Sequence, residues 1–176
     1  MPSSDSGMPG RRSLEAVGAV LASRIGELLI ERGLTLGVAE SCTGGKLGDL
    51  ITDVPGSSDY FLGGVISYSN EAKVQLLGVE RVVLERVGAV SRQVASEMAA
   101  GAREKLRADL GVGITGVAGP SGGTARKPVG LVFIAVSSSK GSFITRNLFR
   151  GSRDSIKKQS ATKALEMLET FVVKHY

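Results

Sequence analysis

Ala39-Glu40-Ser41-Cys42-Thr43-Gly44-Gly45 lies between a short apolar run, residues 34–39, and an amphipathic segment, residues 46–52. This order predicts a strand, a tight turn and the start of a helix. Amide N–H groups at a helix start have no intrahelical acceptor and lie at the positive end of the helix dipole, so they favour an anion or a developing oxyanion. Gly44 and Gly45 lack the side chains that would keep a ligand away.

Ser41 is therefore a candidate nucleophile, and the alternative is that Ser41 or Thr43 only caps the following helix. The chain has one histidine, His175. A Ser-His-Asp triad would need that residue, and a metal cluster built on histidines cannot form. If Ser41 is a nucleophile, we expect its base to be a lysine, a tyrosine or a carboxylate.

Length and composition indicate one soluble globular domain. The chain has 176 residues, of which 42% are hydrophobic and 22% charged, which is ordinary for a protein with a full core. Residues 1–12 are rich in Ser, Gly and Pro, so we expect a disordered tail before one domain over residues 13–176. The chain has no apolar run of membrane-span or signal-peptide type and only one cysteine, so we expect a cytoplasmic location and no membrane partner.

The net charge of +5 is unevenly distributed. Residues 1–124 contain 12 Lys and Arg against 14 Asp and Glu, a net of −2, whereas residues 125–176 contain 10 against 3, a net of +7. The basic last third is a solvated face, a site for a small phosphate-bearing ligand, or a weak nucleic-acid patch. The chain has no Trp and few Tyr and Phe, which argues against the stacking surfaces of single-strand binders, so we expect no nucleic-acid partner.

Hydrophobic periodicity predicts helices that alternate with strands, followed by a late hairpin. The expected helices cover residues 13–32 with Gly33 as a stop, 46–53, 71–77 after an Asn70 cap, 81–87, 92–106 after a Ser91 cap, and 153–174. The expected strands cover residues 35–39, 60–68, 110–114, 130–137 and 142–149. This order predicts a three-layer α/β/α sandwich with a mixed, mostly parallel five-stranded sheet.

A second glycine-rich loop, residues 115–124, follows the third expected strand. Ligands of open α/β sheets bind outside the carboxyl ends of strands, so the two loops are expected to form one shared site. The alternative for the second loop is a structural Gly/Pro turn. Neither loop fits a Walker A motif, a dinucleotide-binding fingerprint or a GxSxG nucleophile elbow.

Tyr68 and Lys73 form a further candidate cluster. Tyr68 ends an expected strand and Lys73 falls in the first turn of the helix after it. A partly buried lysine near the positive end of a helix has its neutral form favoured, which makes it a usable base. Tyr68 could relay the proton or hold the serine hydroxyl. The alternative is a surface lysine beside a half-buried tyrosine.

Eight short motifs then occur in order along the chain: VAESCTGG (38–45), DVPGSS (53–58), YFLGG (60–64), SYSNEAK (67–73), LLGV (76–79), GAVS (88–91), TGVAGP (115–120) and KPVG (127–130). In order and spacing they resemble the CinA C-terminal domain family, whose members are nicotinamide-nucleotide amidases. The likeness covers residues 14–172.

The resemblance implies hydrolysis of the carboxamide of nicotinamide mononucleotide to nicotinic acid mononucleotide and ammonia, a step of pyridine-nucleotide salvage, without a metal or other cofactor. By the motifs, Ser41 is the expected nucleophile, and Tyr68 and Lys73 are its activating partners. Backbone N–H groups of the 41–45 turn are expected to stabilise the oxyanion.

The resemblance also implies a set of substrate-binding residues, drawn from the two glycine-rich loops, the start of the third helix and an Arg-rich stretch at residues 149–153. Arg150 and Arg153 are the candidates for holding the 5′-phosphate. The full set is Glu40, Cys42, Thr43, Gly44, Gly45, Asn70, Thr115, Gly116, Gly119, Pro120, Gly122, Gly123, Arg150 and Arg153.

Three positions depart from the family pattern: Lys46, the Ala125-Arg126 pair and Lys157. None of them removes an expected catalytic residue. By the resemblance we expect a stand-alone amidase domain and a homo-oligomer. Two other functions stay open, a non-catalytic nucleotide- or DNA-linked module of the competence and damage-inducible type, and an amidase for another amide.

Overall fold

The computed structural model describes residues 13–176, and the expected tail over residues 1–12 lies outside this range. The helices are α1 (Leu14–Arg32), α2 (Lys46–Thr52), a 3-10 turn η1 (Ser57–Asp59), α3 (Asn70–Leu77), α4 (Arg81–Val87), α5 (Arg92–Lys105) and α6 (Arg153–His175). The strands are β1 (Leu36–Glu40), β2 (Phe61–Ile66), β3 (Leu110–Gly116), β4 (Leu131–Ser138) and β5 (Gly141–Leu148).

The five strands form one mixed sheet in the order β2-β1-β3-β4-β5. β1 pairs in parallel with both β2 and β3, whereas β4 is antiparallel to β3 and β5. The mixed five-stranded sheet is thus confirmed, and its pairings divide into two parallel and two antiparallel. The antiparallel pairing of β4 with β5 follows from the tight hairpin that joins them, since a two-residue connection cannot join parallel strands.

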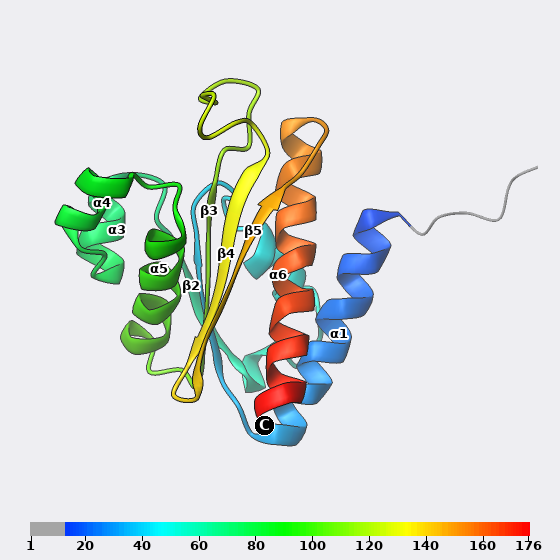
Figure 1. The fold of residues 1–176 in the computed structure, drawn as a ribbon. Coiled ribbons are helices and arrows are strands. Elements are labelled where there is room, and N and C mark those ends of the chain that lie inside the picture. Colours follow the sequence, from blue (N-terminus) through cyan, green and yellow to red (C-terminus); the bar gives the residue numbers. More distant parts are fainter. Residues whose placement is uncertain (1–12) are drawn as a thin grey trace, which may run out of the picture.

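Helices cover both faces of this sheet and make three layers, as predicted (Figure 1). α1, α2 and α6 bury one face, where Leu29, Leu36, Val112 and Leu165 belong to one apolar cluster. α3, α4 and α5 lie on the other side of the sheet in Figure 1, over two smaller clusters. Strands with apolar cover on both faces are buried along their whole length, and β1 and β4 are so buried.

The carboxyl ends of β1, β2 and β3 meet at the same edge of the sheet, because these strands are parallel neighbours. The amide of Ser41 donates to the carbonyl oxygen of Ile114 at 3.0 Å, and the amide of Ser67 donates to that of Glu40 at 2.8 Å. The segments that follow the three strands are therefore tied to one another at their starts.

Two glycines of β3 let helix α5 lie directly on the sheet. A Cβ added at Gly111 would lie 2.0 Å from the carbonyl oxygen of Ala99, and one at Gly113 would lie 2.4 Å from that of Ala95. Backbone atoms of a packed helix cannot move away as a flexible side chain could. The absence of side chains on this strand thus sets the distance between α5 and the sheet.

Most expected elements are present, with small differences at their ends. α1 begins at the Ser13 cap and ends at Gly33, and Ser91 caps α5, both as predicted. The prediction that Asn70 caps α3 is wrong: the Ser69 hydroxyl accepts from the amide of Ala72 at 3.0 Å, and Asn70 is the first helical residue. Serine and asparagine are comparable caps, so two adjacent cap residues leave the choice to the tertiary structure.

Gly111→Ala is expected to lower the free energy of unfolding by about 2 to 3 kcal/mol, because the new methyl group overpacks the contact with α5. The matched control is Gly48→Ala in α2, where a Cβ would be 3.6 Å from its nearest neighbour and helix propensity favours alanine by up to about 1 kcal/mol. Chemical denaturation measures both. Equal stability of the two variants would contradict this account of the packing.

Candidate active site

Ser41 opens into a cavity of about 290 Å³ at the carboxyl edge of the sheet. The residue is 9% exposed and directly follows β1. Its turn is closed by the amide of Gly44, which donates to the carbonyl of Ser41 at 3.1 Å. The cavity is lined by Ser41, Cys42, Tyr68, Asn70, Lys73, Ala89, Val90, Thr115, Gly116, Val117, Ala118, Gly119, Ser121, Gly122 and Arg153.

Lys73 of helix α3 lies beside Ser41 within this cavity. Its Nζ is 3.0 Å from Ser41 Oγ and donates to the carbonyl oxygen of Ser67 at 2.6 Å. The side chain is 1% exposed, and within residues 13–176 no carboxylate pairs with it. The expected pair of nucleophile and lysine is thus within hydrogen-bond reach.

Burial lowers the pKa of the Lys73 amine from its usual value, and the neighbouring Cys42 opposes this only as a smaller effect. Loss of hydration penalises the charged form, and no ion pair compensates for that loss. A neutral amine has a lone pair that accepts the Ser41 proton, while one of its N–H groups still donates to Ser67. The arrangement is that of a serine activated by a lysine base.

Cys42 follows Ser41 and also lines the cavity, but its thiol is protonated at neutral pH. Burial raises the pKa of Cys42 to about 12, and the nearby Glu40 carboxylate acts in the same direction. Because the thiolate is the reactive form of cysteine, this residue is chemically inert beside the serine. Ser41 differs from Cys42 in its 3.0 Å contact with the Lys73 amine, which makes it the better candidate nucleophile.

The other expected residues of the first loop, Glu40, Thr43, Gly44 and Gly45, do not line the cavity. Glu40 is buried, and its carboxylate accepts from the amides of Gly45, Leu47 and Gly48 at 2.8–3.1 Å. Thr43 is fully buried. The expectation that the whole 41–45 turn faces the oxyanion is therefore wrong for the Gly45 amide, which Glu40 already occupies.

Tyr68 lies at the rim of the cavity and is 62% exposed. Its hydroxyl accepts from Arg153 Nη2 at 2.8 Å, and among the described residues this is its hydrogen-bond partner, not Ser41. Arg153 Nη1 also donates to the carbonyl oxygen of Gly119 at 2.6 Å. Arg153 thus joins the segment after β2 to the second glycine-rich loop.

The second glycine-rich loop, residues 115–124, supplies a further wall of the cavity. Thr115 is buried and donates its hydroxyl proton to the carbonyl of Ala89 at 2.8 Å, so it holds the 88–91 segment against the loop. Of the predicted residues in this region, Asn70, Thr115, Gly116, Gly119, Gly122 and Arg153 line the cavity, whereas Pro120, Gly123 and Arg150 do not.

Five lining residues were absent from the predicted set: Ala89, Val90, Val117, Ala118 and Ser121. Ala89 and Val90 belong to the GAVS motif and Val117 and Ala118 to the TGVAGP motif. Both motifs were available in the sequence. The four apolar residues were not predicted because apolar side chains in a loop carry no chemical signal of their own.

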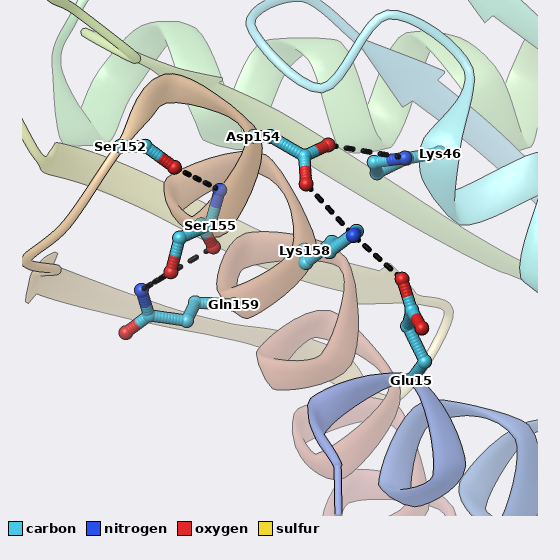
Figure 2. Close-up of polar contacts among 7 residues, drawn as sticks. All are labelled: Glu15, Lys46, Ser152, Asp154, Ser155, Lys158 and Gln159. Carbon is cyan, nitrogen blue, oxygen red and sulfur yellow. Dashed lines mark hydrogen bonds and ion pairs between the residues drawn. The ribbon is translucent and has the colours of Figure 1, made fainter.

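Lys46, one of the departures from the family pattern, does not line the cavity and points toward Asp154 (Figure 2). Its Nζ lies 3.7 Å from Asp154, which also pairs with Lys158 at 2.7 Å, and Lys158 reaches Glu15 of α1 at 2.5 Å. The starts of α1, α2 and α6 are therefore linked by charges at the surface. Because these pairs are exposed, each contributes little to stability.

Over residues 13–176, no cluster of three or more His, Cys, Asp or Glu side chains is placed to hold a metal ion. In the same range no helix combines the length and apolar character needed to cross a membrane.

The fold and this pair define an α/β domain with a serine and a lysine in one buried cavity. The sequence matches the model of the CinA C-terminal domain over residues 18–172, and the chain belongs to this family. The expected family is thereby confirmed.

Relatives and solved structures agree with this assignment. A CinA-like protein of Thermosynechococcus vestitus is 54% identical over 151 residues, which cover 84% of this chain and 36% of that protein. The chain spans about a third of the length of such curated relatives.

Two crystal structures superpose on nearly the whole chain. The competence/damage inducible protein CihA of Agrobacterium tumefaciens is 40% identical, with a TM-score of 0.86 and coverage of 94% of this chain and 98% of that one. A competence-damaged protein (CinA) superfamily member of Escherichia coli is 31% identical, with a TM-score of 0.86 and coverage of 97% and 99%. These names state no reaction.

The lowered pKa of Lys73 predicts a pH dependence of stability. Between that pKa and the ordinary value near 10.5 the unfolded chain binds more protons than the folded one, so the free energy of unfolding rises with pH in this window. In this pH window, the free energy of unfolding of the wild type should rise by up to about 1.4 kcal/mol per pH unit relative to that of Lys73→Met.

Urea titrations from neutral to alkaline pH measure this difference, and the exposed Lys174→Met variant is the control, whose stability should stay parallel to that of the wild type. A constant difference between Lys73→Met and wild type across the window would contradict a lowered pKa.

Proposed function

We propose that this chain hydrolyses the carboxamide of nicotinamide mononucleotide through a Ser41 acyl-enzyme. The single observation that carries the proposal is the 3.0 Å contact between the Lys73 amine and the Ser41 hydroxyl inside the cavity. Family membership supports the choice of substrate, because the motifs that carry Ser41 and Lys73 are those by which the sequence resembles nicotinamide-nucleotide amidases. The first glycine-rich loop, the segment after β2 and the second loop supply the walls.

In the first step, neutral Lys73 accepts the Ser41 proton while Oγ forms a bond to the carboxamide carbon. The amide N–H of Cys42 directly follows the nucleophile, donates to no backbone carbonyl of residues 13–176 and belongs to a residue that lines the cavity, so we assign it to the oxyanion. The C–N bond then breaks, and the Lys73 ammonium gives its proton to the leaving nitrogen, which departs as ammonia.

In the second step, a water molecule attacks the Ser41 ester and Lys73 accepts its proton. The bond between Oγ and the acyl carbon breaks, the carboxylate product leaves, and the proton returns to Ser41. The contact to Lys73 favours this residue over Tyr68 as the immediate base. Tyr68 instead forms the rim with Arg153, where a 5′-phosphate could accept hydrogen bonds from both side chains.

Ser41→Ala is expected to reduce ammonia release from nicotinamide mononucleotide by at least about 1000-fold, since the acyl-enzyme cannot form. Ser23→Ala, on the exposed side of α1, is the matched serine control and should keep wild-type activity. Purified protein is assayed without added metal. Residual activity of Ser41→Ala above about a tenth of wild type would sink the nucleophile assignment.

Arg153→Ala is expected to raise the KM for nicotinamide mononucleotide about tenfold or more and to leave that for nicotinamide riboside unchanged, because only the former has a phosphate. Arg150→Ala is the comparison, since Arg150 was also a predicted phosphate ligand but lies outside the cavity lining. Equal effects of Arg153→Ala on both substrates would instead favour an amidase for an unphosphorylated amide.

A further inference from the structure

Glu40 is a buried acid without a cationic partner. It is 2% exposed, and no lysine or arginine of residues 13–176 forms an ion pair with it. Its carboxylate instead accepts three backbone N–H groups, from Gly45 and Leu47 at 3.1 Å and from Gly48 at 2.8 Å. Charge-assisted bonds of this kind offset the cost of removing the carboxylate from water.

The side chain of Glu40 thereby occupies the start of helix α2. The N–H groups of a helix start would otherwise attract any anion in the neighbourhood, including a substrate phosphate. Within the 41–45 turn, the amides of Ser41 and Gly44 donate to backbone carbonyl oxygens and that of Gly45 donates to Glu40, which leaves those of Cys42 and Thr43 without a backbone acceptor in residues 13–176. Glu40 therefore keeps the amides of Gly45, Leu47 and Gly48 from any other anion.

The main chain of Glu40 makes a second connection, which leads through Ser67 to Lys73. Its carbonyl oxygen accepts from the amide of Ser67 at 2.8 Å, and the carbonyl oxygen of Ser67 accepts from Lys73 Nζ at 2.6 Å. One residue thus holds the turn that carries Ser41 through its side chain and the anchor of Lys73 through its backbone.

We propose that Glu40 is a positioning residue, which sets the distance between Ser41 Oγ and Lys73 Nζ and does not bind substrate. This replaces the expectation that Glu40 is a substrate ligand, and it rests on the proposed role of Ser41 as a nucleophile. Displacement of a reacting group by about 1 Å costs about 100-fold in rate, so the effect falls on kcat.

The chain offers an informative pair of variants. Glu40→Gln keeps the size of the side chain, but its amide nitrogen is a donor and would face at least one of the three N–H groups. Asp49→Asn, on the exposed side of the same helix, makes the same change of carboxylate to amide away from the cavity.

Two readouts separate this proposal from the identity of the substrate. The first is steady-state ammonia release from nicotinamide mononucleotide. The second is the rate at which phenylmethanesulfonyl fluoride modifies Ser41, followed by mass spectrometry. In that reaction Oγ bonds to sulfur, fluoride leaves and Lys73 accepts the serine proton, so it reports activation of the serine alone.

Glu40→Gln is expected to lower kcat about 10- to 100-fold with KM within about twofold, and to slow labelling by a similar factor. Asp49→Asn should change neither. A raised KM with unchanged kcat would overturn the proposal in favour of substrate binding, and unchanged kinetics would overturn it outright. If the wild type is labelled but releases no ammonia, the proposed function fails while slower labelling of Glu40→Gln still supports positioning. A wild type that is neither labelled nor active overturns both.

Amide hydrogen exchange of the wild type covers the case in which Glu40→Gln does not fold. The amides of Gly45, Leu47 and Gly48 should exchange at least about 100-fold more slowly than those of Cys42 and Thr43, since only the former donate to a buried carboxylate. Equal exchange of the two groups would overturn the proposal.

Discussion

The contact between the Lys73 amine and the Ser41 hydroxyl is the interaction on which this account depends. Burying a lysine as an ammonium ion costs hydration free energy. Among residues 13–176, the Lys73 amine donates to the carbonyl oxygen of Ser67 and forms no ion pair with a carboxylate. That environment favours the neutral amine, which is the form that can take a proton from serine. In the proposed function, the same burial that weakens the folded state at neutral pH supplies the base that activates the serine.

The rest of the fold brings these two groups together. Three parallel strands end at one edge of the sheet, and each contributes one wall of the cavity. The glycines of β3 let helix α5 pack against the sheet backbone, which places the segment before α5 beside the second loop. Glu40 connects the turn of Ser41 to the anchor of Lys73. A rigid frame of this kind holds reactive groups at a fixed distance without help from a ligand.

The sequence predicted the layers and the mixed sheet from hydrophobic periodicity, and the strand-end rule placed the two glycine-rich loops at one site. The scarcity of histidine left a lysine, a tyrosine or a carboxylate as the base of Ser41, and the choice of Lys73 and Tyr68 was implied by the resemblance to the family. The sequence did not predict the side-chain contacts. Glu40 is an acidic residue next to a glycine-rich loop, which suggested that it binds substrate. Only the geometry of the turn shows that its carboxylate accepts three backbone amides. Tyr68 was expected at Ser41, yet it bonds to Arg153, which lies 85 residues away along the chain. Arg150 and Arg153 look equivalent in sequence, but Arg153 is the first residue of α6 and lines the cavity, whereas Arg150 precedes the helix and does not line it.

The most direct test of the central claim is a titration of the Lys73 side chain itself. NMR of protein labelled with ¹³C at the lysine ε-carbon follows each amine separately, and Lys73→Arg assigns the signal by its loss. The account predicts that Lys73 titrates clearly below the ordinary lysine value near 10.5, whereas exposed lysines titrate close to it. A Lys73 signal that titrates at or above 10.5 would contradict the account, because the amine beside Ser41 would then be a charged ammonium ion at neutral pH and could not accept the serine proton.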